Sequence, residues 1–150
     1  MNTKLVSSIG AITRSRLVTI GTDALLTEAA RLLSHTQISL LVVCNPDGTM
    51  AGVITKTNIV RRVGHDQANA CMTAAVDLMS RDVTYCRPAD SIPDVLSIMQ
   101  KGDFVHLLVV DNACKPQGVL NARDGFRALL ADEQYEESLL RNYVMGVGYR

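Results

Sequence analysis

The chain has 150 residues, of which 47% are hydrophobic and 20% charged, so it can bury one domain core or two very small ones. Fifteen basic residues balance fifteen acidic ones, and the large aromatic residues are two Phe and four Tyr, with no Trp. Nucleic-acid binding is not expected, because gripping the phosphate backbone needs a basic surface and holding single strands needs aromatic stacking.

The dominant feature of the sequence is an internal repeat at an offset of 66 residues. Residues 26–63 align with residues 92–129 without a gap, and the apolar positions agree better than the identities do. Beyond one small gap, the match continues upstream in two short blocks, which pair residues 9–13 with 76–80 and Val18-Thr19 with Val83-Thr84.

This repeat predicts two small domains of similar structure in one chain. The first covers residues 5–63 and the second covers residues 76–130. Residues 64–75 are rich in Gly, His, Asp, Gln and Asn, which is typical of an exposed linker. Residues 131–150 lie outside the repeat and predict a C-terminal helix and tail.

The first copy predicts, in chain order, a strand over 17–20, a helix from 26, a strand over 40–44, a turn over 45–48, a strand from about 50 and a helix from about 57. Apolar residues recur at i, i+3, i+4 and i+7 from Leu26, the period of a helix with one buried face. The strand over 40–44 is continuously apolar, which indicates burial on both faces.

The second copy predicts the same order: a strand over 82–86, a helix from 92, a strand over 106–110, a turn over 111–114, a strand from about 117 and a helix from about 123. Ser91 and Asp94 have capping-box spacing, and Pro93 suits the first turn of a helix. The predicted fold is therefore α/β in the α+β sense, with two β-α-β-β-α repeats related by a pseudo-twofold axis.

The C-terminal segment 131–145 carries acidic residues early and Arg141 late, as the helix dipole prefers. Its apolar stripe either packs on its own module or docks on a second chain. A homodimer is expected in both cases.

Each copy contains a glycine that leads through a strand to the start of a helix. Unpaired N–H groups at such a start favour a phosphate, and a carboxylate one turn later can accept hydrogen bonds from ribose hydroxyls. The first copy has Thr55 and Asn58 at the hydroxyl and acid positions, and the second has Asn121 and Asp124. Since an amide suits ribose less well than a carboxylate, the cleft containing Asp124 is favoured.

A resemblance to a known family is carried by the segments DLMSRDVTYCRPADSIPDVLSIM and FVHLLVVDNACKPQGVLNARDGF. They are similar to a CBS domain, which typically shows Met-Thr-x-x-Val, a helix, a strand ending in Val-Val-Asp, and Gly-x-x-[Ser/Thr]-x-x-Asp. The first copy, with LVTIGTDALLTEAARLL and ISLLVVCNPDGTMAGVITKTNIV, is similar as well. The chain therefore resembles a tandem CBS (cystathionine β-synthase) domain pair, also called a Bateman-type module.

The resemblance implies two clefts between the copies that hold adenosine-containing ligands such as AMP, ATP, NAD or S-adenosylmethionine, with no other cofactor and no metal. The cleft of Asp124 is expected to hold the purine between the first strand and the apolar strand of the second copy. The expected contacts there are Thr84, Tyr85, Cys86, Phe104, Val105, His106, Asn121, Arg123 and Asp124. By symmetry, the other cleft is expected to use Val18, Thr19, Ile20, Ile38, Ser39, Leu40, Thr55, Thr57 and Asn58.

Structural roles stand beside these functional ones. Thr55 and Asn121 can act as helix caps, Asp124 can complement a helix dipole, and His106 can be a hydrogen-bonded residue of a buried strand. Lys56 and Arg123 can form a solvated face.

Two functions follow from the sequence. The first is a regulatory module that binds adenine nucleotides and signals energy or metabolite levels to an unknown partner; the alternative is a structural dimerisation module with degenerate clefts. An enzyme is not expected, because the sequence shows no nucleophile elbow, P-loop, Rossmann glycines or metal cluster. A cytoplasmic location is expected, since there is no C-x-x-C pair, no signal-peptide pattern and no apolar run that could span a bilayer.

Overall fold

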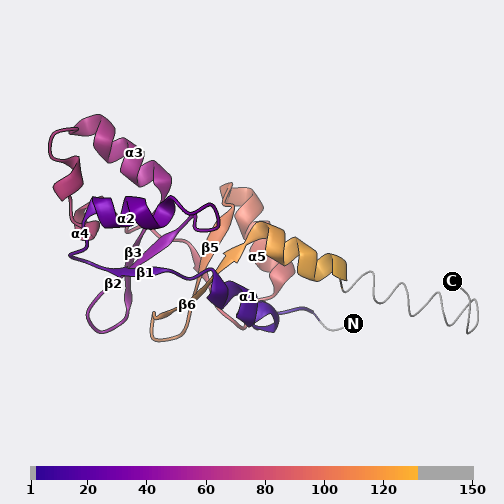
Figure 1. Ribbon diagram of the computed structural model, residues 1–150. Helices are drawn as coiled ribbons and strands as arrows, with labels where there is room; N and C mark the ends of the chain where they lie inside the picture. Colours follow the sequence, from indigo (N-terminus) through magenta and orange to yellow (C-terminus); the bar gives the residue numbers. More distant parts are fainter. Residues whose placement is uncertain (1–2, 132–150) are drawn as a thin grey trace, which may run out of the picture.

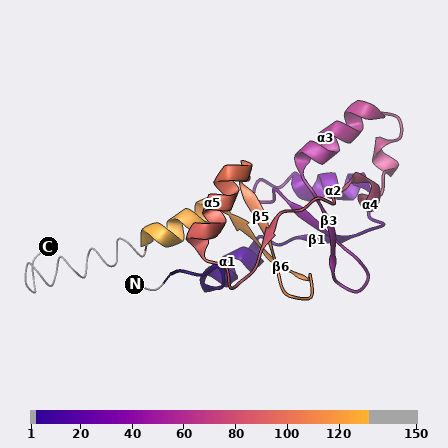
Figure 2. The ribbon, with the colours of Figure 1, turned by 180° about the vertical axis from the view of Figure 1, so that it is seen from behind.

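Two three-stranded sheets lie side by side in the computed structural model of the protein, with helices on the outer face of each (Figures 1 and 2). The structure describes residues 3–131. The first half contains η1 (Val6–Ile9), α1 (Gly10–Ser15), β1 (Thr19–Gly21), α2 (Leu26–Leu33), β2 (Leu41–Cys44), β3 (Met50–Ile54) and α3 (Lys56–His65). The second half contains η2 (Ala70–Met72), α4 (Ala75–Leu78), β4 (Tyr85–Cys86), α5 (Ile92–Gly102), β5 (His106–Val110), β6 (Pro116–Asn121) and a helix over 122–131.

Both sheets have the same topology, which confirms the predicted repeat. β1 is parallel to β2, which is antiparallel to β3, and β4, β5 and β6 repeat this arrangement. Thr19 lies opposite Val42, and Tyr85 lies opposite Leu108, so the offset of 66 residues holds through the first strands. The predicted pairing of Val18-Thr19 with Val83-Thr84 was therefore wrong by one residue, because the gap lies further upstream.

The continuous apolarity of the central strands is explained by burial on both faces. Leu41 and Val43 of β2 pack into the core beneath the helices of the first repeat. The alternate side chain, Val42, faces the second sheet. A third core therefore lies between the two sheets and joins the repeats; its buried members are Leu40, Val42, Val53, Leu108, Val110 and Val119.

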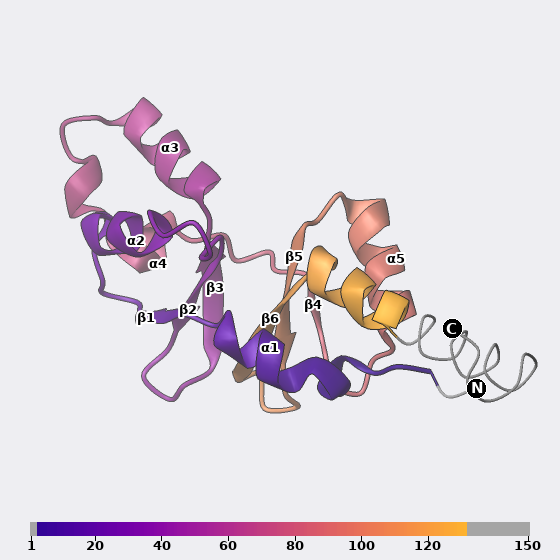
Figure 3. The ribbon, with the colours of Figure 1, turned by 45° about the vertical axis from the view of Figure 1, so that its right-hand side comes forward.

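The segment that leads into each repeat packs on the other repeat. α1 lies against β6, as Figure 3 shows, and Val6 and Ile9 enter the core of the second repeat. In the same way, α4 packs against β3, where Ser80 and Val53 exchange two backbone hydrogen bonds of 2.8 and 3.0 Å. Sequence periodicity predicts which face of a segment is buried but not which repeat it packs on.

Glycines permit this crossing, by which the leading segment of each repeat packs on the other repeat. A Cβ atom at Gly118 would lie 2.7 Å from the backbone carbonyl carbon of Thr13, and one at Gly52 would lie 2.7 Å from the carbonyl oxygen of Ser80. These are the glycines that open the two predicted ligand motifs. Their absent side chains allow the leading segment of the other repeat to approach the strand backbone.

Two details of the prediction were wrong, and a third lies outside the described residues. The linker is not simply exposed, because α3 continues to His65, and Ala70 and Thr73 are buried against the first repeat. The first strands are shorter than predicted: β1 begins at Thr19 and β4 at Tyr85. The predicted helix over 131–145 lies, apart from its first residue, outside the described part of the chain.

Candidate functional site

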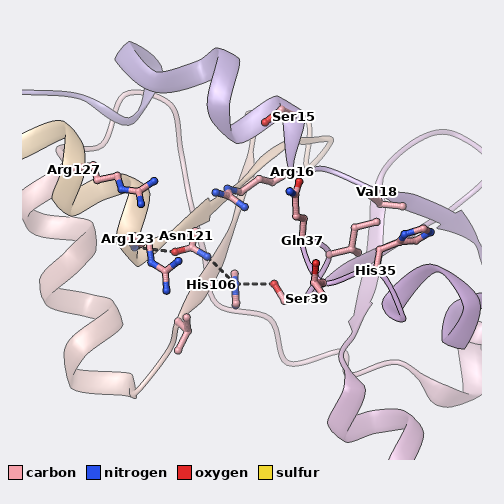
Figure 4. Close-up of a pocket in the computed structure, with 13 residues that line it drawn as sticks. Ser15, Arg16, Val18, His35, Gln37, Ser39, His106, Asn121, Arg123 and Arg127 are labelled. Atoms are coloured by element: carbon pink, nitrogen blue, oxygen red, sulfur yellow. Dashed lines mark hydrogen bonds between the residues drawn. The ribbon is translucent and has the colours of Figure 1, made fainter.

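A cavity of about 1070 Å³ lies where the second repeat meets the segments that precede β1 and β2. We call it the arginine cavity, because the guanidinium groups of Arg16, Arg123 and Arg127 line it (Figure 4). Its other lining residues are Ser15, Val18, His35, Thr36, Gln37, Ile38, Ser39, Val105, His106 and Asn121. None of these described lining residues carries a carboxylate, so the cavity favours anions.

Arg16 forms an ion pair with Asp124 at the edge of this cavity. Nε of Arg16 donates to one carboxylate oxygen, and Nη2 donates to the other at 3.1 Å. The Asp124 side chain is 4% exposed and the Arg16 side chain is 28% exposed, so the pair presents its cationic member to the cavity. The hydrogen bond to Asp124 raises the pKa of Arg16 above its ordinary value.

A chain of hydrogen bonds crosses the boundary between the repeats beside the cavity (Figure 4). Oδ1 of Asn121 accepts the N–H of Arg123 at 2.8 Å, which orients the amide so that Nδ2 donates to Nε2 of His106 at 3.1 Å. Nε2 of His106 also lies 2.7 Å from the hydroxyl of Ser39 in the first repeat. Because Nε2 accepts from the amide, the ring proton lies on Nδ1.

His106 is neutral in this arrangement. Burial lowers the pKa of its imidazole below the ordinary value, the charge of Arg16 lowers it further, and Asp124 opposes the shift. A proton on Nε2 would face the amide N–H of Asn121, so protonation would break the chain of hydrogen bonds. His106 thus has the structural role considered from the sequence and also lines the cavity.

A second cavity, of about 650 Å³, occupies the pseudo-symmetric position at the start of α3. We call it the Phe104 cavity, after the aromatic ring in its wall. It is lined by Ser39, Leu40, Val53, Thr55, Lys56, Thr57, Asn58, Ser80, Asp82, Val83, Thr84, Asp103, Phe104, Val105, His106 and Leu108. The hydrogen-bonded pair Ser39 and His106 lines both cavities and therefore separates them.

Asn58 ties α3 to the leading segment of the second repeat. Its Oδ1 accepts hydrogen bonds from the backbone N–H and the hydroxyl of Thr55, both at 2.9 Å. Its Nδ2 donates to the carbonyl of Leu78 at 3.2 Å and to the hydroxyl of Ser80 at 3.0 Å. Thr55 and Asn121 therefore lie at helix starts and bond locally there, as the capping alternative predicted.

The two cavities group the predicted residues differently from the expectation. Asn121 and Arg123 share a cavity with Val18 and Ile38, whereas Thr84 and Phe104 share one with Thr55 and Asn58. Each expected cleft combined the strands and the helix start of a single copy. The crossing of the leading segments instead places the entry to β1 beside the second repeat and the entry to β4 beside the first.

Five predicted contacts, Asp124 among them, do not line either cavity. Ile20 and Cys86 point into the two helical cores, and burial raises the pKa of the Cys86 thiol to about 12. Thr19 is exposed, and Tyr85 packs beside the guanidinium of Arg87, 5.6 Å from the ring centroid. Asp124 reaches the arginine cavity only through Arg16, and the predicted contact of its carboxylate with ribose stays a prediction.

Sequence reasoning missed several lining residues. Arg16, Gln37 and Arg127 line the arginine cavity, and Asp82 and Asp103 line the Phe104 cavity. Each lies just before a strand or one turn inside a helix. Repeating the motif search on both sides of each predicted strand would have found them.

Within residues 3–131, no helix is both long and apolar enough to cross a membrane. Within the same residues, no three His, Cys, Asp or Glu side chains gather as metal ligands would.

Comparison with known proteins follows the same division into repeats. The family model for the CBS domain matches residues 6–65 and again residues 75–131. A curated relative, an uncharacterized 17.7 kDa protein of Acidianus ambivalens, is 24% identical over 126 residues, which span 84% of this chain and 75% of that protein. Four other curated relatives, three of them homoserine O-acetyltransferases, are much longer, and the match spans only 13% to 20% of them.

Solved structures share the fold. CBSX2 in complex with AMP has a TM-score of 0.73 at 21% identity, with 87% of this chain and 98% of that chain covered. The CBS domain pair of MJ0100, in complex with 5′-methylthioadenosine and S-adenosyl-L-methionine, has a TM-score of 0.70 at 20% identity and covers 88% of this chain and 99% of its own. Since the family model matches both repeats and thus most of the chain, the protein belongs to the CBS domain family and carries a tandem pair of these domains.

Proposed function

We propose that this CBS pair is a cytoplasmic regulatory module that binds an adenine nucleotide, such as AMP, ATP or NAD, in the arginine cavity and signals its level to a partner protein. One observation carries the proposal: three guanidinium groups, from α1's C-terminal end and the last described helix, converge on a cavity large enough for a nucleotide. Guanidinium groups bind phosphate through charge-assisted hydrogen bonds. The four cysteines are free thiols, in keeping with a reducing compartment.

The related structures support an adenosine-containing ligand. CBSX2 is in complex with AMP, and the MJ0100 pair is in complex with two adenosine derivatives. Arg16 can couple ligand binding to a change in the packing of α1, because a ligand phosphate would compete with Asp124 for the Arg16 guanidinium. Such a ligand shifts the packing of α1 only if it binds the altered arrangement more tightly.

Calorimetric titration with AMP, ATP and NAD tests this function. We expect Arg127→Ala to weaken nucleotide binding about tenfold, the loss of one charge-assisted contact. The matched control is Arg61→Ala, which removes the same charge at the repeat-equivalent position of α3, outside the lining of both cavities. We expect that control to change binding by no more than about twofold.

The alternative function has a distinct outcome. If none of the three nucleotides releases heat or raises Tm, the chain is a structural association module and the nucleotide proposal is wrong. Equal losses of affinity in Arg127→Ala and Arg61→Ala would show that the nucleotide binds elsewhere.

We also propose that the module forms a homodimer through the outer faces of α3 and the last described helix. Val60 and Phe126, at equivalent positions of the two repeats, are 70% and 55% exposed, and Val63 and Leu130 extend the apolar surface. We expect Phe126→Asp to convert the dimer to a monomer in light scattering after gel filtration. Met72→Asp, at an exposed apolar residue of η2, should leave the dimer intact. A monomeric wild-type protein would refute the proposal.

A further inference from the structure

The two cavities differ in charge at equivalent positions of the repeat. Arg16 in the arginine cavity corresponds to Asp82 in the Phe104 cavity, and Gln37 corresponds to Asp103. Arg123 corresponds to Thr57. The Phe104 cavity therefore has two carboxylates and one cation, Lys56, where the arginine cavity has three cations.

This difference changes which ligand each cavity admits. A phosphate in the Phe104 cavity would share its surface with Asp82 and Asp103, which are both exposed, and like charges repel each other there. A ligand with a neutral or positive group at the same place avoids that repulsion. The same fold thus separates phosphorylated from unphosphorylated ligands, by attraction in the arginine cavity and by repulsion in the Phe104 cavity.

The Phe104 ring gives the second cavity a surface for a flat base. It is the only Phe, Tyr or Trp ring among the described residues that line either cavity, and it remains 41% exposed. Its position is fixed by packing on Gly102, where a Cβ atom would lie 2.3 Å from Cε2 of the ring. Its backbone N–H also donates to the carbonyl of Met99 at 2.8 Å.

Apolar side chains and hydroxyl groups complete this site. Val53, Val83 and Leu108 line the wall of the cavity, and Thr55 and Thr57 bring hydroxyl groups at the start of α3. Apolar walls with a few hydroxyls suit a base and a ribose. The two carboxylates of its lining disfavour the phosphates of a nucleotide.

We infer that the Phe104 cavity is a second binding site that takes an unphosphorylated nucleoside, with a neutral or positively charged 5′ group, while the arginine cavity takes the phosphorylated ligand. This extends the proposed function in that both sites take adenosine compounds. The second site depends on Asp82, Asp103 and Phe104, none of which lines the arginine cavity, so it can exist without the first.

Three probes of matched size test the charge requirement: adenosine, AMP, and 5′-amino-5′-deoxyadenosine, which is cationic at neutral pH. They are titrated into the Arg123→Ala, Arg127→Ala double variant, in which phosphate binding by the arginine cavity is weakened. We expect the amino compound to bind at least as tightly as adenosine, and AMP to bind at least tenfold more weakly than adenosine. AMP binding as tightly as adenosine in this variant would overturn the inference.

Two further variants locate the site. Asp82→Asn with Asp103→Asn, added to that double variant, should improve AMP binding at least tenfold and leave adenosine unchanged. Asparagine suits position 103 because Asp103 has a positive φ of 59°, a conformation that asparagine tolerates. An unchanged preference for adenosine would show that the two carboxylates do not set it.

Phe104→Leu in the otherwise unaltered chain should weaken adenosine binding at least tenfold and leave ATP binding unchanged. The matched control is Tyr85→Leu, which removes an exposed aromatic ring that lines neither cavity. Equal adenosine binding in Phe104→Leu and wild type would contradict the inference. A far-UV circular dichroism spectrum and Tm confirm that each variant is folded.

The two proposals fail separately. If ATP binds the wild-type chain and adenosine does not, the second site is absent and the nucleotide function stands. If adenosine binds and requires Phe104 while no nucleotide binds, the second site stands and the proposed function fails.

Discussion

Gly118→Val is expected to lower the free energy of unfolding by about 3 kcal/mol, which is the upper part of the range for overpacked cores. The first atom of the new side chain would lie 2.7 and 2.8 Å from the backbone carbon and oxygen of Thr13. No flexible side chain can yield there, so α1 must move away from β6. Urea denaturation followed by circular dichroism measures the loss.

Gly64→Ala is the matched control, because nothing lies within 4 Å of a Cβ atom at that position in α3. Alanine is the better helix former, so this change should be neutral or stabilise the chain by about 0.5 kcal/mol. A Gly118→Val protein as stable as wild type would mean that α1 does not lie against β6 in solution.

Arg16→Met is expected to cost about 3 kcal/mol of unfolding free energy, the lower end of the range for a buried ion pair that loses one partner. The carboxylate of Asp124 is buried, and both of its oxygens accept from Arg16. Methionine retains the apolar stem but leaves that charge without its partner. Denaturation in urea at pH 7 gives the value directly.

Asp124→Asn breaks the same ion pair by neutralising its carboxylate. It should lower the free energy of unfolding by less, about 1 kcal/mol. The Arg16 side chain is partly exposed, so its guanidinium can turn into the arginine cavity and meet water. Equal costs for the two substitutions would contradict the asymmetry of burial on which this prediction rests.

The sequence predicted the elements well, because each has a local cause. The apolar period from Leu26 yields α2, the cap at Ser91 precedes α5 with its hydroxyl accepting the N–H of Asp94, and the apolar run at 106–110 is β5. These features depend on residues within one or two turns of each other. The repeat then predicted that both halves share one topology.

The composition of each cavity could not be predicted in the same way. It depends on the crossing of the leading segments, which is decided by contacts between residues far apart in the chain. Arg16 lies between a short helix and a strand in no recognisable motif, yet it binds the carboxylate at position 124. The one feature of the sequence that could have indicated the crossing is the glycine at positions 52 and 118. Where another segment approaches a strand backbone this closely, there is no room for a side chain.

The same crossing determines when the chain can finish folding. Arg16 and Asp124 are 108 residues apart, so during synthesis α1 leaves the ribosome long before its docking surface exists. The first repeat in turn lacks α4 until the linker has been made. Such long-range pairing slows folding, and it makes the two repeats one cooperative unit that is completed only when β6 and the helix over 122–131 have been synthesised.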